Sequence, residues 1–292
     1  MRTSSARQIA EPVNTQIEER SIRRGDIDLR LVINRSHGHA RFMDYRVGNY
    51  EAKRELLDTV ARELGLHKIF TLVEKGDSQS WRGVGFTREG IFPGLFRTAD
   101  AYAMARLYDP SGTVIPGGPA HRQAPIPDGV SPQTRRLRRP EGLTLRPVAD
   151  AAARGELLER LNGALGPLPF ARLRAPDLAL QTQMQKRSGW LCAELDTSFG
   201  HATLGIAPLP DSAAQLAIAS YAGQTLIDEL ATAEIGNVFG LAPTQDSWAT
   251  ALFSGLGFRT TGQLVDQLRG ESGFVNATVW HRRLVAKVKH PD

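Results

Sequence analysis

Apolar and polar residues alternate in two short runs near the start of the chain, over 27–33 and 40–45. A period of two is typical of a strand that buries one face and exposes the other. The segment between the runs, 34–38, ends in glycine and predicts a hairpin turn. We therefore expect two paired strands at this position.

The pattern then changes to a helical period. Apolar residues recur at helical spacing from Leu56 to Leu64, and Gly65 supplies a C-terminal stop. The run 68–73 predicts a strand, a second short helix is expected from about Ser78, and 100–106 predicts a returning strand. The first half thus predicts a β-β-α-β unit, continued by a helix and further strand.

A stretch rich in proline and glycine, 109–142, separates this half from a second periodic half. Such composition is typical of an extended linker. Residues 1–24 are polar without a sustained apolar period and predict a flexible tail. The expected organisation is a tail, a first domain over 25–108, a linker over 109–142 and a second domain over 143–292.

The second half begins with a predicted strand over 143–149. Asp150 is placed to cap the helix that follows, whose apolar residues are Leu157, Leu158, Leu161 and Leu165. Further strands are predicted over 189–195, 201–207, 215–220 and 240–243, and further helices over 224–234 and from 246.

Composition supports an ordinary globular chain of about two domains, since 41% of the 292 residues are hydrophobic and 23% are charged. The longest apolar runs are far shorter than the roughly 20 residues that a membrane helix requires. The polar N-terminus does not resemble a signal peptide. We expect a cytoplasmic protein without a membrane segment.

The net charge of +5 does not by itself indicate nucleic-acid binding. Much of the local excess lies in the arginine-rich segment 135–139 of the linker, and no basic face interleaved with aromatic residues accompanies it. The single cysteine, Cys192, lies in an apolar run and predicts a buried structural thiol. His37 and His39 lack a second ligand pair at metal spacing, so no metal site is expected.

Two motifs resemble a known family. The C-terminal run 252–258, LFSGLGF, is followed by GQLV at 262–265, GF at 273–274 and VWH at 279–281. This resembles the closing helix and strands of GCN5-related N-acetyltransferases, in particular the β-lysine N-acetyltransferases. The stretch 90–104, GIFPGLFRTADAYAM, resembles a motif in the N-terminal half of the same family, with Leu95 at the first aromatic position.

The resemblance implies an α/β fold with a mixed sheet: a C-terminal acetyltransferase domain preceded by a half-sized domain of similar layout. It also implies transfer of an acetyl group from acetyl-CoA to a primary amine of a small amino acid such as β-lysine, by direct attack. A second hypothesis is a catalytically inactive binding or scaffolding protein with a closed coenzyme cleft, for which a protein partner or a homodimer is expected. A third is a different acyl-coenzyme, or a different reaction, in the same cleft.

Coenzyme binding in this family requires backbone N–H groups of a glycine-containing loop at a helix N-terminus. The matching segment is expected at 220–225, a degenerate version of the family's loop with one glycine and no arginine. In it Ala222, Gly223, Gln224 and Thr225 would hold the phosphates, unless the cradle has been lost. The resemblance places Thr250 and Phe253 toward the pantetheine and the sulfur. These six residues are the predicted coenzyme-binding set.

Only a neutral amine attacks a thioester, so the reaction requires a base. The sequence offers Glu194, Asp196 and Asp266 as candidate bases, of which Glu194 is preferred, and Tyr221 as acid, although a hydrogen-bonded structural role fits each of them. The resemblance places Asp266, Asn276 and Trp280 at the substrate. Positions that would grip a diamino acid are Val275, Asn276 and Thr278 here, which leaves the amine substrate open.

Overall fold

The computed structural model describes residues 17–35, 37–117, 122–130, 137–157, 175–185, 187–270 and 273–284. These residues form a mixed α/β fold around one large sheet. The N-terminal half contains β1 (Ile17–Arg24), β2 (Ile27–Asn34), β3 (His39–Asp44), α1 (Tyr50–Leu64), β4 (Lys68–Val73), α2 (Lys75–Gly83), β5 (Thr87–Phe92), β6 (Ala101–Tyr108) and β7 (Val114–Ile115). The C-terminal half contains β8 (Thr144–Pro147), a helical segment over 151–157, β9 (Leu178–Met184), β10 (Arg187–Asp196), β11 (His201–Ala207), α4 (Ala213–Thr232), β12 (Asn237–Pro243), α5 (Ser247–Gly255), β13 (Arg259–Gly270) and β14 (Gly273–Arg283).

The two halves share one topology. The strand order is β1-β2-β3-β4-β6-β5 in the first half and continues β13-β14-β12-β11-β10-β9-β8 in the second, so β5 and β13 are equivalent strands that meet at the centre. In each half one central pair is parallel, β3 with β4 and β11 with β12, and the other pairs of this path are antiparallel. The repeated topology supports a duplicated unit joined edge to edge.

The central contact between β5 and β13 is made by Gly90 and Gly262. A Cβ atom on Gly262 would lie 2.3 Å from the Cα of Gly90. Only two glycines allow the backbones to approach this closely. Each glycine ends a copy of the motif Gly-Phe-x-x-x-Gly, which begins at Gly85 in the first half and at Gly257 in the second.

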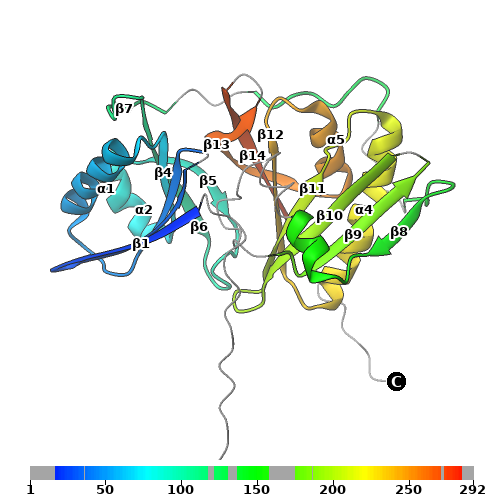
Figure 1. Cartoon of the computed structure of the whole chain (residues 1–292), viewed down its shortest axis with the longest axis horizontal. Coiled ribbons are helices and arrows are strands. Elements are labelled where there is room, and N and C mark those ends of the chain that lie inside the picture. Colours follow the sequence, from blue (N-terminus) through cyan, green and yellow to red (C-terminus); the bar gives the residue numbers. More distant parts are fainter. Residues whose placement is uncertain are drawn as a thin grey trace, which may run out of the picture.

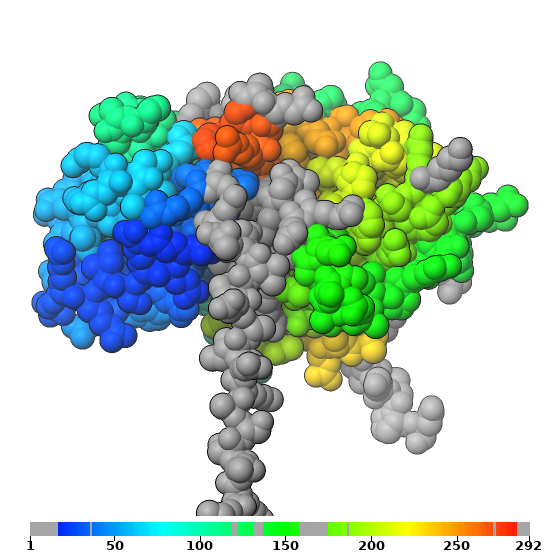
Figure 2. Space-filling model, viewed as in Figure 1, coloured from blue at the N-terminus to red at the C-terminus, as the bar shows by residue number. Residues whose placement is uncertain are grey.

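Each half also extends a hairpin to the other half. The β5–β6 turn places the carbonyl oxygen of Leu95 3.1 Å from Nδ1 of His201, at the start of β11. In return, the β13–β14 hairpin stacks Phe274 on His67, beside the start of β4, with ring centroids 4.4 Å apart. The hairpin lies at the boundary between the two halves in Figure 2, where it is orange to red.

Three apolar clusters stabilise this arrangement by burying strand and helix faces. The core of the first half includes side chains of α1 and α2. The core of the second half includes side chains of α4 and α5. Between the halves, a cluster that includes Phe92, Phe239 and Leu241 draws its buried members from strands and the loop after β5. The helix-free faces of the two halves therefore pack together, and the two helix pairs lie toward opposite ends (Figure 1).

Most predicted elements are present. The strand predicted over 68–73 is β4, and Gly65 ends α1 with a left-handed φ of 61°. Asp150 caps the helical segment after β8, because its carboxylate accepts a hydrogen bond from the N–H of Ala153 at 2.8 Å. Of the apolar positions predicted for that helix, Leu157 is buried; Leu158, Leu161 and Leu165 lie outside the described residues, as do positions 135–136 of the linker.

Two assignments differ. Residues 17–24, predicted as part of the tail, form β1, whose charged side chains suit an edge strand; Glu19, for example, pairs with Arg30 on β2. Residues 215–220, predicted as a strand, lie inside α4. A short apolar run does not distinguish a strand from a buried helix, and here the helical period continues to Leu230. The second half contains a further strand, β9, which was not predicted from the sequence.

Candidate functional site

The junction between β11 and α4 is where the family resemblance requires a phosphate cradle. Here the chain leaves β11 at Ala207, passes a cis bond to Pro208, and begins α4 after the N-cap Ser212. No glycine occurs between Gly205 and Gly223. The residue before the cap is Asp211, whose carboxylate would repel a phosphate at the positive end of the helix.

The predicted cradle residues are therefore not at a helix start. Ala222, Gly223, Gln224 and Thr225 lie in the middle of α4, where backbone N–H groups are used by the helix itself. Gly223 instead allows close packing, because a Cβ there would lie 2.8 Å from Cδ1 of Leu256. The predicted strand over 215–220 is part of α4, so residues 222–225 do not form the loop at a helix start on which that prediction rested.

An apolar side chain, that of Leu209, lies near the point where β11 and β12 stop pairing. The two strands pair only from His201 with Asn237 to Leu204 with Gly240. Leu209 packs against both the cluster beneath α4 and α5 and the cluster on the other face of the sheet. Leu209, two residues after the end of β11, therefore lies where the two strands diverge and contacts the clusters on both faces of the sheet.

The other two predicted coenzyme-binding residues, Thr250 and Phe253, contact other parts of the protein. Oγ1 of Thr250 accepts a hydrogen bond of 3.3 Å from Nε2 of Gln123 in the linker. The N–H of Ala124 donates to the carbonyl oxygen of Thr244 at 3.0 Å, so this part of the linker lies across the end of β12. Phe253 is 1% exposed and stacks on Trp280 with centroids 5.3 Å apart, which makes it a core residue.

The predicted acid and base lie on opposite faces of the sheet. Leu191, Ala193 and Leu195 of β10 belong to or pack on the core that α4 covers. Because side chains alternate along a strand, Glu194 points to the other face, which is also the face of buried Cys192. Tyr221 belongs to α4. The structure does not bring Glu194 and Tyr221 together, whereas Cys192 is buried as predicted.

Two of the three predicted substrate residues meet at the junction of the halves. The backbone N–H of Asp266 donates to Oδ1 of Asn276 at 3.0 Å, and the Asp266 carboxylate lies 3.0 Å from Nε2 of His67. Asp266 occupies a left-handed backbone conformation, φ 48°, in a bulge of β13. Trp280 is separate from them, because it is buried against Phe253.

His39 is fully buried beside this junction. Its ring stacks on Phe274 with centroids 5.2 Å apart. Burial, and then the nearby Lys68 ammonium, hold the pKa of the His39 imidazole well below its ordinary value. The imidazole is therefore neutral in the folded protein.

We expect acid to destabilise the fold through His39. Below a pH of about 6.5 the unfolded chain binds a proton that folded His39 does not, so the free energy of unfolding falls, by up to about 1.4 kcal/mol per pH unit. Urea unfolding at several pH values between about 7.5 and 5 measures this loss. His39→Phe keeps the stack on Phe274 and should have a shallower slope; equal slopes for the two proteins would contradict the assignment.

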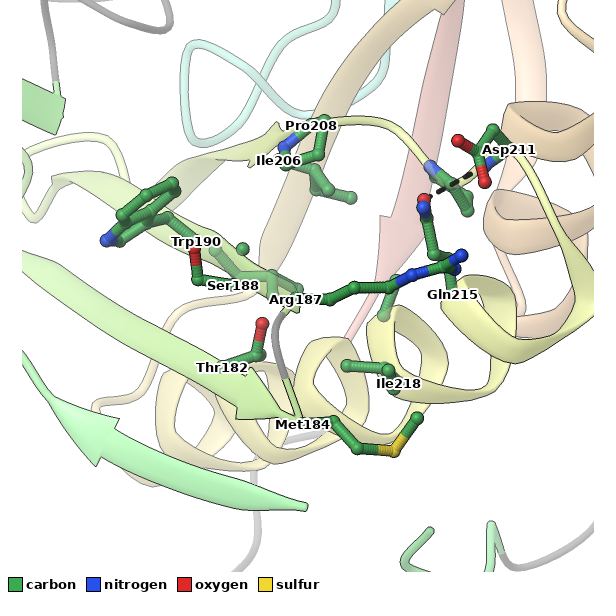
Figure 3. Close-up of a pocket in the computed structure, with 14 residues that line it drawn as sticks. Thr182, Met184, Arg187, Ser188, Trp190, Ile206, Pro208, Asp211, Gln215 and Ile218 are labelled. Carbon is green, nitrogen blue, oxygen red and sulfur yellow. Dashed lines mark hydrogen bonds between the residues drawn. The ribbon is translucent and has the colours of Figure 1, made fainter. Parts of the chain in front are cut away.

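A cavity of about 490 Å³ lies beside the same β11–α4 junction (Figure 3). Its lining comes from the ends of β9 and β10, the end of β11 and the first turns of α4. Met184, Leu191, Ile206 and Ile218 supply apolar surface. The polar lining residues are Thr182, Arg187, Ser188, Asp211 and Gln215.

Sequence reasoning missed this cavity because it missed β9 and placed α4 too late. The alternation in 178–184, LALQTQM, was the available signal. The described residues contain no cluster of three or more metal-ligating side chains and no helix that could cross a membrane.

Comparison with solved structures finds acetyltransferases, each similar to about half of the chain. A ribosomal-protein-S18-alanine N-acetyltransferase from Escherichia coli is 16% identical at a TM-score of 0.38, over 51% of this chain and 99% of that one. A putative acetyltransferase from Salmonella typhimurium with acetyl-CoA is 16% identical at 0.37, over 52% and 99%. A spermidine N-acetyltransferase from Vibrio cholerae in complex with CoA and spermine is 12% identical at 0.38, over 50% and 98%. No family model and no curated protein matches the chain.

Proposed function

We propose that this chain is a binding protein built on the acetyltransferase fold, and that it holds a small ligand in the β11–α4 cavity instead of transferring an acetyl group. The observation that carries the proposal is the junction itself. It offers Asp211 and no glycine where a coenzyme would need free N–H groups. We infer that Leu209, which packs against the clusters on both faces of the sheet, blocks the space between β11 and β12.

The residues present do not fit coenzyme A. A phosphate binds at a helix N-terminus because N–H groups and the helix dipole favour negative charge, and a carboxylate there opposes it. In addition, the hydroxyl of Thr250 already accepts a hydrogen bond from the linker residue Gln123. The proposed acid and base, Glu194 and Tyr221, lie on opposite faces of the sheet, which further disfavours acetyl transfer.

Acetyl transfer remains the second candidate, on one observation. The pairing of β11 with β12 stops after Leu204 and Gly240. If Leu209 moved aside, a thioester could enter between the two strands. The acceptor would then be a primary amine of a small amino acid, in the direction of Asp266 and Asn276.

Calorimetric titration of the full chain with acetyl-CoA separates the two candidates. We expect no saturable heat up to about 1 mM, which corresponds to a binding free energy weaker than about −4 kcal/mol. With acetyl-CoA and β-lysine present, coenzyme A should be released at the same rate with and without the protein. The same titration with Leu209→Ala tests whether Leu209 alone prevents binding.

Micromolar binding by the wild-type chain would overturn the proposal, provided that Ala214→Asp in the first turn of α4 abolishes it. That variant adds a second carboxylate at the exposed helix start and leaves the core unchanged. Glu234→Gln, just after the C-terminal end of α4, is the control for a charge change far from the helix start.

A further inference from the structure

The cavity at the β11–α4 junction is lined by Thr182, whose hydroxyl has no protein partner among the described residues. Thr182 is 4% exposed, and within the described residues its side chain makes no hydrogen bond. Its hydroxyl points into the space beneath the first turns of α4 (Figure 3). A hydroxyl that lines a cavity and has no protein partner can form a hydrogen bond to a ligand, so a ligand group that pairs with Thr182 gains affinity.

Gly189 keeps that hydroxyl accessible. It faces Thr182 across the β9–β10 ladder, and a Cβ on Gly189 would lie 3.0 Å from Oγ1 of Thr182. Glycine thus leaves open the space beside the hydroxyl.

Charges of both signs line the cavity without pairing with each other. Arg187 and Asp211 are both exposed, and in the described part of the chain neither forms an ion pair. The Arg187 side chain extends across the cavity toward the start of α4 (Figure 3). A ligand that carries one anionic and one cationic group would satisfy both residues.

The edge of β10 is also free at this point. The last pair between β10 and β11 joins Trp190 to Ala207, and Pro208 then turns the chain away. Arg187 and Ser188 extend past that point, paired on one side with β9. The other side of β10 has no neighbouring strand within the described residues, so it can pair with an extended backbone.

We propose that the cavity binds a short peptide with two free ends, of two or three residues. The C-terminal carboxylate pairs with Arg187 and the N-terminal ammonium with Asp211. The peptide backbone lies along the free edge of β10 and meets the Thr182 hydroxyl. An apolar side chain packs on Met184, Ile206 and Ile218.

The size of the cavity agrees with this ligand class. Pockets of roughly 300–1,000 Å³ hold ligands of drug size, which a dipeptide or tripeptide matches. A free edge of β10 adds recognition of a peptide backbone, which a ligand without amide groups would not use. The inference rests on the proposed function, because a coenzyme bound at the same junction would exclude the peptide.

The test uses the tripeptide Ala-Leu-Ala and two capped forms, one acetylated at the N-terminus and one amidated at the C-terminus. Calorimetry on the full chain should give saturable binding of the free peptide and an affinity about three- to tenfold weaker for each capped form. Arg187→Gln should weaken the free peptide and remove its advantage over the amide. Asp211→Asn should likewise weaken binding of the free peptide and remove its advantage over the acetylated peptide.

Matched variants separate binding from folding. Thr182→Val keeps the shape and removes the hydroxyl, and Gly189→Ala fills the space beside it; both should weaken the free peptide. Arg23→Gln and Asp128→Asn change exposed charges away from the cavity and should leave binding unchanged. Unfolding curves confirm that each variant is folded.

Three results would overturn the proposal. Equal affinity for free and capped peptides would show that the charged ends of the peptide do not contribute to binding. Absence of peptide binding together with absence of acetyl-CoA binding would reject the ligand class and leave the proposed function standing. Binding of acetyl-CoA in competition with the peptide would reject the proposed function itself.

Discussion

Gly262→Ala is expected to destabilise the protein by about 3 kcal/mol. The added methyl carbon would lie 2.3 Å from the Cα of Gly90 and 2.8 Å from the carbonyl oxygen of Glu89. Both are backbone atoms of β5, so they cannot move aside as a flexible side chain would. Relief requires β5 and β13 to separate at the contact that joins the two halves. Urea unfolding followed by tryptophan fluorescence measures the loss.

The converse substitution should be milder. A Cβ on Gly90 would lie 3.0 Å from the Cα of Gly262, a tight contact that a small shift relieves. Gly76→Ala, where nothing lies within 4 Å of the added carbon, is the control and should be neutral or slightly stabilising in helix α2. A Gly262→Ala protein as stable as the Gly76→Ala protein would show that the strands are not in contact.

Lys68→Met is expected to cost about 3–5 kcal/mol, because it leaves the buried carboxylate of Glu89 without its cationic partner. The side chains of Lys68 and Glu89 are 0% and 4% exposed, and Nζ lies 2.7 Å from Oε2. Nζ also donates to the carbonyl oxygen of Val265 on β13 at 2.6 Å, so the lysine joins the two halves. Arg30→Met removes a solvent-exposed pair with Glu19 and should cost at most about 1 kcal/mol.

The effect should depend on pH in a defined direction. Burial raises the pKa of the Glu89 carboxyl, and Lys68 opposes that rise. Without Lys68 the folded protein binds a proton more readily than the unfolded chain, so the deficit of Lys68→Met should shrink as the pH is lowered from 7.

The double variant Lys68→Met/Glu89→Leu replaces the pair by apolar side chains and should recover most of the lost stability. A double variant as unstable as Lys68→Met alone would contradict the assignment of the cost to an unpaired buried carboxylate. The measurement is the same urea titration, repeated at two pH values.

Elements whose pattern is local were predictable from the sequence. The period of two around 27–33, the helical spacing that ends at Gly65 and the strand over 68–73 match β2, α1 and β4. Burial of alternate or helically spaced side chains is itself what forms these elements. The repeat of Gly-Phe-x-x-x-Gly at 85–90 and 257–262 is present in the sequence, but only the structure shows that the last glycines of its two copies meet.

The candidate site was less predictable, because its residues depend on the position of one helix start. Residues 215–220 are apolar enough for either a strand or a buried helix, and packing against the sheet resolves them as α4. That moved the predicted phosphate segment from a loop into a helix interior. Asp266 and Asn276 were placed together by a bulge in β13, which no local pattern indicated.

The sequence alone determined those strands and helices whose pattern is local, such as β2, α1, β4, β6, β10 and β11. Only the tertiary structure decided which faces meet, that Glu194 and Tyr221 lie apart, and that Thr182, Arg187 and Asp211 line one cavity. The physical reason is that secondary structure follows from the period of neighbouring side chains, whereas a site forms between residues far apart in sequence. Their distance is set by the packing of whole strands and helices.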